Sequence, residues 1–318
     1  MNRLKIIFMG TPAFALPSLD LLNLSSHRLE AVVVPPDRPF GRGGKVRPAP
    51  VKAWALKQGL EIRQPGKLSE ESFTAWIEEK KPDLVVTAAF GKILPPGLLK
   101  LPALGAINLH ASYLPAYRGA APIHRAVIDG AEYSGVSVIE MSSDLDAGDI
   151  IMQEREAISP FDTTGMLHDR LAVRGASLLM KVVDALAQGP VKTIPQNQAL
   201  ATYAPPLTPE DEKLDWNCTA VELYNRIRGL NPWPGAYTTF EGKRLKVWRA
   251  SRPETGLSGE QGQAPGTILA VGEASLTVAT TDGALTLLDL QPAGKKPMDA
   301  GSFCCGYRIE PGRRLNGE

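Results

Sequence analysis

The chain has 318 residues, with 35 Lys and Arg against 34 Asp and Glu, and therefore a formal net charge of +1. Its length suggests two domains of ordinary size, and its 43% hydrophobic and 22% charged residues exclude collagen-like, disordered and coiled-coil chains. The neutral balance also argues against a protein that coats nucleic acid non-specifically, because such binders usually carry a basic excess.

Cysteine usage and the N-terminus predict a cytoplasmic protein. Three cysteines without C-x-x-C spacing are too few for a disulfide framework, so we expect reduced thiols. The apolar run at the N-terminus is shorter than that of a signal peptide and ends at Pro12. No stretch approaches the roughly 18 apolar residues of a membrane span, so we expect no association with a membrane.

In the first two thirds of the chain, short apolar runs alternate with helical patterns. The runs are β-branched, as in a parallel sheet covered on both faces, and predict strands at residues 4–9, 29–34, 83–89, 106–111 and 136–141. Helices are predicted at residues 13–24, 51–58, 69–79, 121–129 and 164–187. This alternation predicts a doubly wound α/β domain, which we assign to residues 1–192.

The pattern changes after this domain. Residues 193–208 are rich in Gln, Ala and Pro and lack periodicity, so they predict a linker. A helix is predicted at residues 219–230, and short strands at 236–240, 245–250, 267–271, 276–280 and 285–290. These elements predict a second, smaller domain over residues 209–318, a small barrel or sandwich with an OB-like fold among the candidates.

Polar residues gather at the end of the fourth predicted strand, in the segment Asn108-Leu-His110-Ala-Ser112. Because side chains alternate along a strand, Asn108 and His110 point to one face, at the edge where open α/β sheets bind ligands. An amide suits a developing oxyanion, and an imidazole exchanges protons near neutral pH. The acidic turn 142–149 supplies a carboxylate that could return to pair with His110.

Asn, His and Asp without an obvious nucleophile suit acyl transfer by direct attack of an amine. The alternative is structural, since a single His on a strand and an Asp-rich turn are both common in proteins without catalytic roles. We expect no metal site, because the four histidines, at positions 27, 110, 124 and 168, lack the spacing of metal ligands.

These residues also resemble a known family. Asn-x-His, Ser-Tyr-Leu-Pro, Arg-Gly-Ala-Ala-Pro and Leu-Asp-x-Gly-Asp are similar to motifs of the folate-dependent formyltransferases. The resemblance implies a Rossmann-like first domain and catalytic roles for Asn108, His110 and Asp146, with no covalent enzyme intermediate. It further implies a wall for 10-formyltetrahydrofolate made by Ser112, Tyr113, Leu114 and Pro115, in which Tyr113 replaces the usual Leu.

Other segments resemble one group of this family, the methionyl-tRNA formyltransferases. Residues 36–52 are similar to the loop with which that group contacts the acceptor end of the initiator tRNA, which implies tRNA contacts by Arg42, Lys45 and Arg47. Residues 231–236 and 290–298 are similar to its C-terminal tRNA-binding domain, for which we expect an OB-like barrel. The implied reaction transfers the formyl group of 10-formyltetrahydrofolate to the α-amine of initiator methionyl-tRNA, without a metal or an obligate protein partner.

Local charge agrees with binding of tRNA. Residues 36–52 carry five basic side chains against one acidic, and residues 213–252 carry eight against three. Scattered solvated charges are the alternative, because a linear count does not show that residues share a face. Two other functions stay open: a formyltransferase acting on a sugar-nucleotide amine, and a tRNA-binding protein with an inactive α/β domain.

Overall fold

The chain divides into two compact units in the computed structural model, which describes residues 2–37, 47–253 and 263–316. The first unit takes in residues 1–122, 134–157 and 168–205, and the second takes in residues 123–133, 158–167 and 206–318. Most of the predicted linker therefore belongs to the first unit, and two short segments of the predicted first domain belong to the second.

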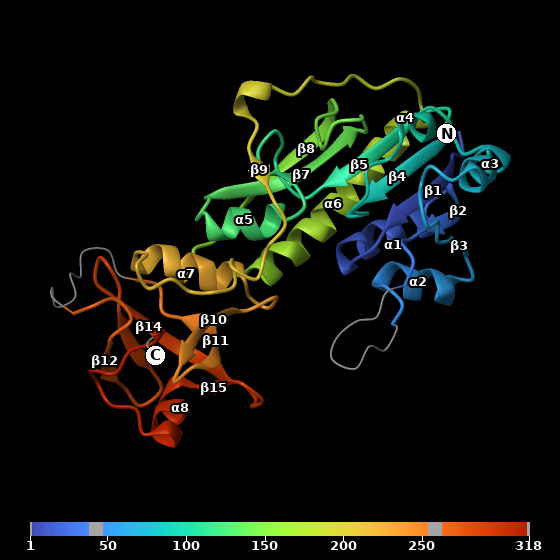
Figure 1. Ribbon diagram of the computed structural model, residues 1–318. Coiled ribbons are helices and arrows are strands. Elements are labelled where there is room, and N and C mark those ends of the chain that lie inside the picture. Colours follow the sequence, from blue (N-terminus) through green and yellow to red (C-terminus); the bar gives the residue numbers. More distant parts are fainter. Residues whose placement is uncertain (1, 38–46, 254–262, 317–318) are drawn as a thin grey trace. The chain divides into compact units, whose positions relative to one another are not determined.

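A seven-stranded sheet forms the first unit, with the strand order β3-β2-β1-β4-β5-β7-β8 (Figure 1). Neighbours from β3 to β5 are parallel, whereas β7 is antiparallel to β5. All five predicted strands are present, and β3 and β8 are additional. The strands are β1 (Lys5–Gly10), β2 (Arg28–Val33), β3 (Glu61–Arg63), β4 (Leu84–Ala88), β5 (Ala106–His110), β7 (Tyr133–Glu140) and β8 (Ile150–Ala157).

Helices cover both faces of this sheet, as expected for a doubly wound domain. On one face, Phe73 and Trp76 of α3 pack in a common core with Met9 of β1. On the other, a Cβ added to Gly175 of α6 would lie 3.0 Å from Leu109, so α6 lies directly on β5. The helices of the first unit are η1 (Ala13–Ala15), α1 (Leu16–Leu24), α2 (Pro50–Gln58), α3 (Glu71–Lys80), α4 (Pro96–Leu99), η2 (Gln198–Leu200) and, from residue 168 on, α6 (Thr164–Leu186). Helix α5 (Pro122–Ile128) belongs to the second unit from residue 123 on.

The predicted linker is tied to the first unit by backbone hydrogen bonds. Its strand β9 (Tyr203–Ala204) pairs in parallel with β6 (Arg118–Gly119). Before it, Ile194 forms an isolated bridge with Ile150 at the start of β8. Residues 193–205 therefore form a strap on the α/β unit.

An antiparallel sheet with the strand order β10-β11-β14-β13-β12 forms the second unit. Residues near the C-terminus join its two ends, because Ile268 N–H donates to Arg313 O and Asn316 N–H donates to Thr239 O. The sheet thus closes as a small barrel, in agreement with the expected OB-like fold. Its elements are α7 (Ala220–Gly229), β10 (Ala236–Phe240), β11 (Lys243–Ala250), β12 (Ile268–Val271), β13 (Leu276–Ala279), β14 (Ala284–Pro292), β15 (Met298–Asp299) and α8 (Ala300–Tyr307).

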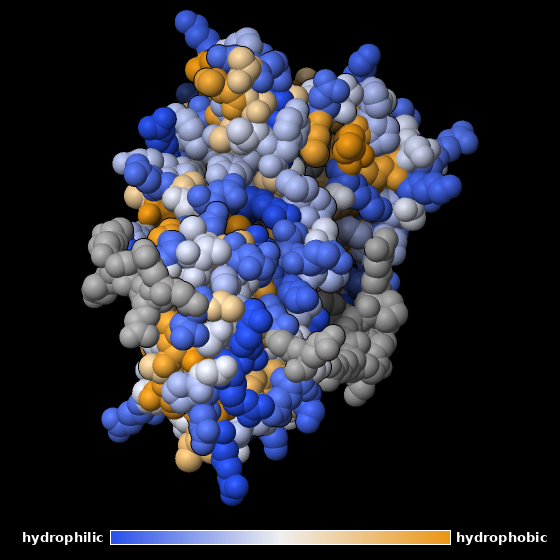
Figure 2. Space-filling model, turned by 60° about the vertical axis from the view of Figure 1, so that its left-hand side comes forward, coloured by the Kyte–Doolittle hydropathy of each residue, from blue (hydrophilic) through white to orange (hydrophobic). Residues whose placement is uncertain are grey.

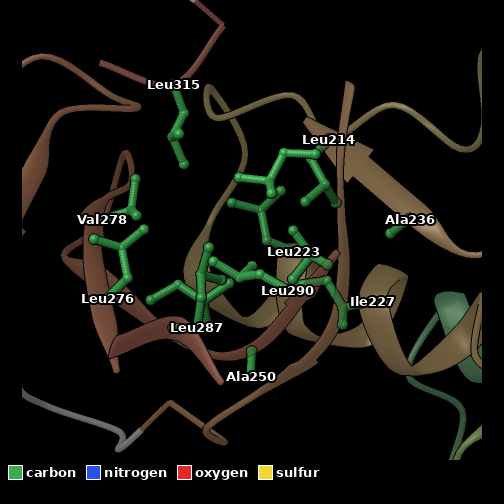
Figure 3. Close-up of a cluster of buried hydrophobic side chains, with 14 of the residues drawn as sticks. Leu214, Leu223, Ile227, Ala236, Ala250, Leu276, Val278, Leu287, Leu290 and Leu315 are labelled. Carbon is green, nitrogen blue, oxygen red and sulfur yellow. The ribbon is translucent and has the colours of Figure 1, made fainter. Parts of the chain in front are cut away.

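Leucine, isoleucine and valine side chains fill the barrel. Leu223 and Ile227 of α7 meet Leu276, Leu287 and Leu290 of the sheet, and all five are at most 1% exposed (Figure 3). At the N-terminus of α7, Thr219 and Glu222 form a reciprocal capping box, which satisfies the first free N–H groups of the helix. The helix predicted at residues 219–230 is therefore present, and it buries Leu223 and Ile227 in the core.

The surface is largely hydrophilic on the face seen in Figure 2, where hydrophobic residues lie in small separate groups. Among the helices that the structure describes, none combines the length and the apolar character needed to cross a membrane.

Candidate active site

Strand β5 carries the two polar residues that the sequence places on one face. In the parallel register Asn108 lies beside Thr87 of β4, and in the antiparallel register His110 lies beside Ser137 of β7. Asn108 is half-buried and His110 is 6% exposed, whereas Leu109 between them points into the core under α6. Because β5 is a central strand, hydrogen bonds to β4 and β7 hold its backbone at Asn108 and His110 from two sides.

Asp146 lies in the turn between β7 and β8. Its φ is +49°, in the left-handed region that Asp tolerates better than most residues. The turn folds back on β7, where Glu140 N–H donates to Asp149 O at 2.9 Å. A Cβ at Gly148 would lie 1.8 Å from Glu140 O, so this turn requires glycine at that position. The Asp-x-Gly-Asp motif is thus the sequence of a tight turn that presents Asp146.

The structure brings the three predicted catalytic side chains together. Asn108 Nδ2 donates to Asp146 Oδ1 at 3.3 Å, and His110 Nδ1 lies 3.5 Å from Asp146 Oδ2. Of the two N–H bonds of Asn108 Nδ2, the hydrogen bonds among described residues use one. The second remains for a further acceptor, such as an oxygen that gains negative charge.

His110 faces an oxygen on each side of its ring. Its Nε2 lies 2.9 Å from the carbonyl oxygen of Tyr117, while Nδ1 faces the carboxylate of Asp146. A neutral imidazole can donate from only one nitrogen, whereas an imidazolium donates from both. Two acceptor oxygens therefore face the ring of His110, one at each nitrogen.

Thr87 fixes the orientation of the Asn108 amide. Its side chain is 2% exposed, and its hydroxyl donates to Asn108 Oδ1 at 2.7 Å. Because the Asp146 carboxylate can only accept, the Nδ2 group must face Asp146, and the amide oxygen on the other side then accepts from Thr87. Sequence reasoning missed this residue, although a Thr within the apolar run 83–89 was a usable signal.

The four residues expected to form the folate wall differ in exposure. Ser112 and Leu114 are buried; Ser112 Oγ donates to Ala116 O at 2.6 Å, and Leu114 packs in a small apolar cluster. Tyr113 and Pro115 are half-buried and present part of their surface. The guanidinium of Arg155 lies 4.8 Å from the centre of the Tyr113 ring, within cation–π range. Ser112 and Leu114 thus hold the shape of the loop, whereas Tyr113 and Pro115 are accessible to a ligand.

The predicted tRNA-contacting residues are only partly covered by the structure. Arg42 and Lys45 lie outside the described residues, and Arg47 is exposed. On the barrel, two basic side chains lie over aromatic rings: the guanidinium of Arg244 is 3.7 Å from the centre of Tyr237, and Lys246 Nζ is 4.9 Å from that of Trp248. In the part of the chain that the structure describes, no group of three or more His, Cys, Asp or Glu could hold a metal ion.

Both units match known protein families. Residues 3–183 match the family described as formyl transferase, and residues 206–308 match the formyl transferase C-terminal domain. A methionyl-tRNA formyltransferase of Moorella thermoacetica is 47% identical over 312 residues, covering 98% of this chain and 99% of the relative. One of Pelotomaculum thermopropionicum is 44% identical over 311 residues and covers 97% of both chains.

Solved structures share the fold at low identity. An N-formyltransferase of Helicobacter canadensis, in complex with folinic acid and dTDP-3-aminofucose, superposes with a TM-score of 0.65 at 17% identity, over 91% of this chain and 99% of that one. HypX of Aquifex aeolicus in complex with tetrahydrofolic acid gives a TM-score of 0.64 at 16% identity. This chain spans about half of HypX, 51%, while 99% of this chain is covered. These likenesses show the common fold.

Proposed function

This chain belongs to the formyl transferase family, and from that premise we propose that it transfers the formyl group of 10-formyltetrahydrofolate to the α-amine of initiator methionyl-tRNA. The observation that carries the proposal is the near-complete match, across both units, to relatives that are 42–47% identical and named methionyl-tRNA formyltransferases. A cytoplasmic setting is part of the proposal, and it agrees with the three free cysteines.

The site geometry supports direct transfer between the two substrates. In the proposed reaction the neutral amine attacks the formyl carbon, a new C–N bond forms, and the bond from that carbon to the folate nitrogen breaks. The formyl oxygen gains negative charge during the attack, and the second N–H of Asn108 Nδ2 is placed to stabilise it. No side chain of the site forms a covalent bond with the formyl group.

Protons must move in the opposite direction to the formyl group. The attacking nitrogen loses a proton, and the departing folate nitrogen gains one, so one group can serve both steps. We assign this role to His110, whose ring lies between the Asp146 carboxylate and the carbonyl oxygen of Tyr117. Asp146 faces His110 and Asn108 together, and its negative charge would stabilise the imidazolium in the transition state.

The loop after β5 offers a surface for the pterin of the folate. Tyr113 and Pro115 are half-buried and follow His110 by three and five residues, so a planar ligand in contact with them lies next to the reacting groups. Buried Leu114 and the hydrogen bond from Ser112 hold this loop in place. An aromatic ring at position 113 is compatible with a planar heterocycle, because aromatic faces stack.

The barrel supports the RNA part of the proposal. By the β10–β11 register, Tyr237 lies opposite Lys246 and Thr239 opposite Arg244, so these side chains share the outer face. Aromatic rings beside basic groups are the usual elements of single-stranded nucleic-acid surfaces. Phe240 points the other way and is 5% exposed, which makes it a core residue and not a stacking platform.

The direct test is incubation with methionyl-tRNA and 10-formyltetrahydrofolate, followed by deacylation and detection of formylmethionine. A dTDP-amino sugar replaces methionyl-tRNA in a parallel reaction. Formylmethionine without formylated sugar is the expected result. Formylation of the sugar alone would assign the protein to the first alternative, and RNA binding without either product would assign it to the second.

Replacement of Arg47, the described member of the predicted tRNA loop, tests the RNA contact by itself. For Arg47→Ala we expect a KM for methionyl-tRNA several-fold higher, with less dependence on salt concentration, because one phosphate contact is lost. The KM for the folate should stay unchanged. Lys57→Ala, a change of charge at the end of α2, is the matched control. Equal effects of the two variants on tRNA kinetics would contradict a specific contact by Arg47.

A further inference from the structure

The strap, residues 193–205, packs against the segment that borders the candidate active site (Figure 1). The N–H of Tyr117 donates to Thr202 Oγ1 at 2.8 Å, next to the pairing of β6 with β9. At Gly119 a Cβ would lie 2.7 Å from Ala204 O, and the φ of +121° also favours glycine. The strap therefore leaves no room for a side chain at position 119.

Gln196 of the strap is 8% exposed and uses its whole amide in hydrogen bonds. Its Nε2 donates to Asp146 O at 2.8 Å and to Gly148 O at 2.7 Å. Its Oε1 accepts from Nη2 of Arg118 at 2.7 Å and from Nε at 3.1 Å. Both donors and both acceptor positions are thus occupied, so one side chain joins the catalytic turn to a buried cation.

Arg118 holds Gln196 in this position. Its side chain is only 2% exposed, and within the described residues its guanidinium hydrogen bonds go to the amide oxygens of Gln196 and Gln198. Burial of a guanidinium is costly unless its N–H groups are bonded, so the two glutamines and the cation stabilise one another. The fork geometry of the guanidinium also fixes the plane of the Gln196 amide.

The turn that carries Asp146 is consequently held from two sides. Gly119 N–H donates to Asp146 Oδ2 at 2.9 Å, and Gln196 holds the backbone carbonyls of Asp146 and Gly148. The carboxylate itself faces Asn108 and His110. A shift of the turn would move the carboxylate away from both groups, and misplacement by about 1 Å can reduce a catalytic rate by about 100-fold.

We propose that Gln196, held by the buried Arg118, is a positioning residue that sets the place of the Asp146 carboxylate during formyl transfer. The inference rests on the proposed function, because it takes Asp146 as part of the reacting site. The strap then has a role in catalysis, although the composition of residues 193–205 is that of a linker.

Two substitutions at Gln196 test the proposal. Gln196→Leu keeps most of the side-chain volume and removes all four hydrogen bonds. Gln196→Glu keeps the oxygen that faces Arg118 and adds an ion pair, but points a second oxygen instead of N–H groups at the two turn carbonyls. Because Gln196→Glu retains a partner for the buried cation, it tests the turn even if Gln196→Leu folds poorly.

The matched control is Gln198→Leu. Gln198 lies on the same strap and accepts from the same guanidinium at 2.8 Å, but its side chain is exposed and does not bond to the turn. A role of the strap in folding alone would show in both positions, as a lower Tm with an unchanged rate per folded molecule. A positioning role would separate the two positions.

For both Gln196 variants we expect kcat to fall by about 10- to 100-fold, because the Asp146 carboxylate is displaced from the groups that it faces. The KM for methionyl-tRNA should stay within about twofold, and Gln198→Leu should lower kcat by less than about threefold. Rates are expressed per folded molecule, with the folded fraction taken from thermal unfolding at the assay temperature.

Asp146→Asn separates this inference from the proposed function. If that variant keeps the normal kcat, the assignment of Asp146 is wrong, and the positioning role fails with it. If Asp146→Asn loses activity while both Gln196 variants keep kcat within twofold of the unaltered protein, only the positioning role is overturned. Equal losses in the Gln196 and Gln198 variants overturn it as well.

Discussion

Strand β5 and the β7–β8 turn hold the candidate catalytic residues in different ways. Asn108 and His110 stand on a central strand, which the hydrogen bonds of β4 and β7 fix on both sides. Asp146 stands on a turn, and side chains and backbone groups distant in sequence hold it there. The backbone hydrogen bonds to neighbouring strands hold the residues of a strand in place, whereas the residues of a turn need additional contacts, here called tethers. Substitutions should therefore act by different routes on the two sides.

The largest loss should come from the strand side, by removal of a reacting group. For Asn108→Ala we expect kcat for formyl transfer to fall by about 10²- to 10³-fold, the usual result of losing one oxyanion donor. Thermal unfolding should change little, because Asn108 is only half-buried and the β5 backbone bonds remain. A rate close to that of the unaltered protein would contradict the role assigned to Asn108.

The turn side should be sensitive to a change that touches no reacting group. In Gly148→Ala the new methyl group would meet Glu140 O at 1.8 Å, so the turn must shift and Asp146 must move with it. We expect a fall in kcat of about 100-fold and a loss of stability of about 1–3 kcal/mol. Steady-state kinetics and thermal unfolding measure the two effects.

Gly97→Ala in α4 is the control for that change, since nothing lies within 4 Å of the added methyl group. It should leave both quantities unchanged. If Gly148→Ala lowers stability but leaves kcat intact, catalysis tolerates displacement of the turn. The claim that the turn must be held in place for catalysis would then be wrong.

The strand side was the more predictable of the two from sequence. Alternation along a short apolar run placed Asn108 and His110 on one face, and the register of β5 agrees with it. Asp146 was identified only by resemblance, because charge pattern alone pointed to an acidic turn without choosing a residue. Strand β8 was missed because its polar residues, Gln153 to Glu156, hide the apolar pattern of an edge strand.

The tethers of the turn were not predictable from local pattern. Gln196 lies 50 residues from Asp146 and 78 from Arg118 in sequence, and periodicity carries no information about contacts over such distances. Its segment has the composition of a linker, and only the fold shows that it is a strap. Thr87 differs, since a hydroxyl in an otherwise apolar strand predicts a buried polar contact, though not its partner.

Thr87 provides a smaller test of the strand side. Thr87→Val removes the hydroxyl that orients the Asn108 amide and keeps the shape of the side chain. We expect kcat to fall by about 10-fold, the equivalent of one hydrogen bond of about 1.4 kcal/mol, with little change in KM. Thr87→Ser keeps the hydroxyl and should restore most of the rate. If both variants lose activity equally, packing in β4 is responsible and not the hydrogen bond.

The smallest effect on catalysis should come from a tether that holds a loop elsewhere. In the second unit, Arg125 donates to both carboxylate oxygens of Asp211, at 2.7 and 2.9 Å, and lowers the pKa of Asp211 from its ordinary 3.8 to about 2. For Asp211→Asn we expect a loss of about 1–2 kcal/mol in stability, with kcat within about twofold. A loss of kcat as large as that expected for Gly148→Ala would show that contacts far from the candidate active site affect catalysis as well.

The pH dependence of this tether has a definite sign. A carboxylate whose pKa is lower in the folded state stabilises the fold fully above its unfolded pKa, and the contribution is lost as the pH falls through the folded pKa. The difference in Tm between the unaltered protein and Asp211→Asn should thus be constant above about pH 5 and shrink toward pH 2. A difference in Tm that does not depend on pH would mean that the Arg125–Asp211 ion pair does not hold this loop. The loop of Asp211 and the turn of Asp146 would then be held by different kinds of contact.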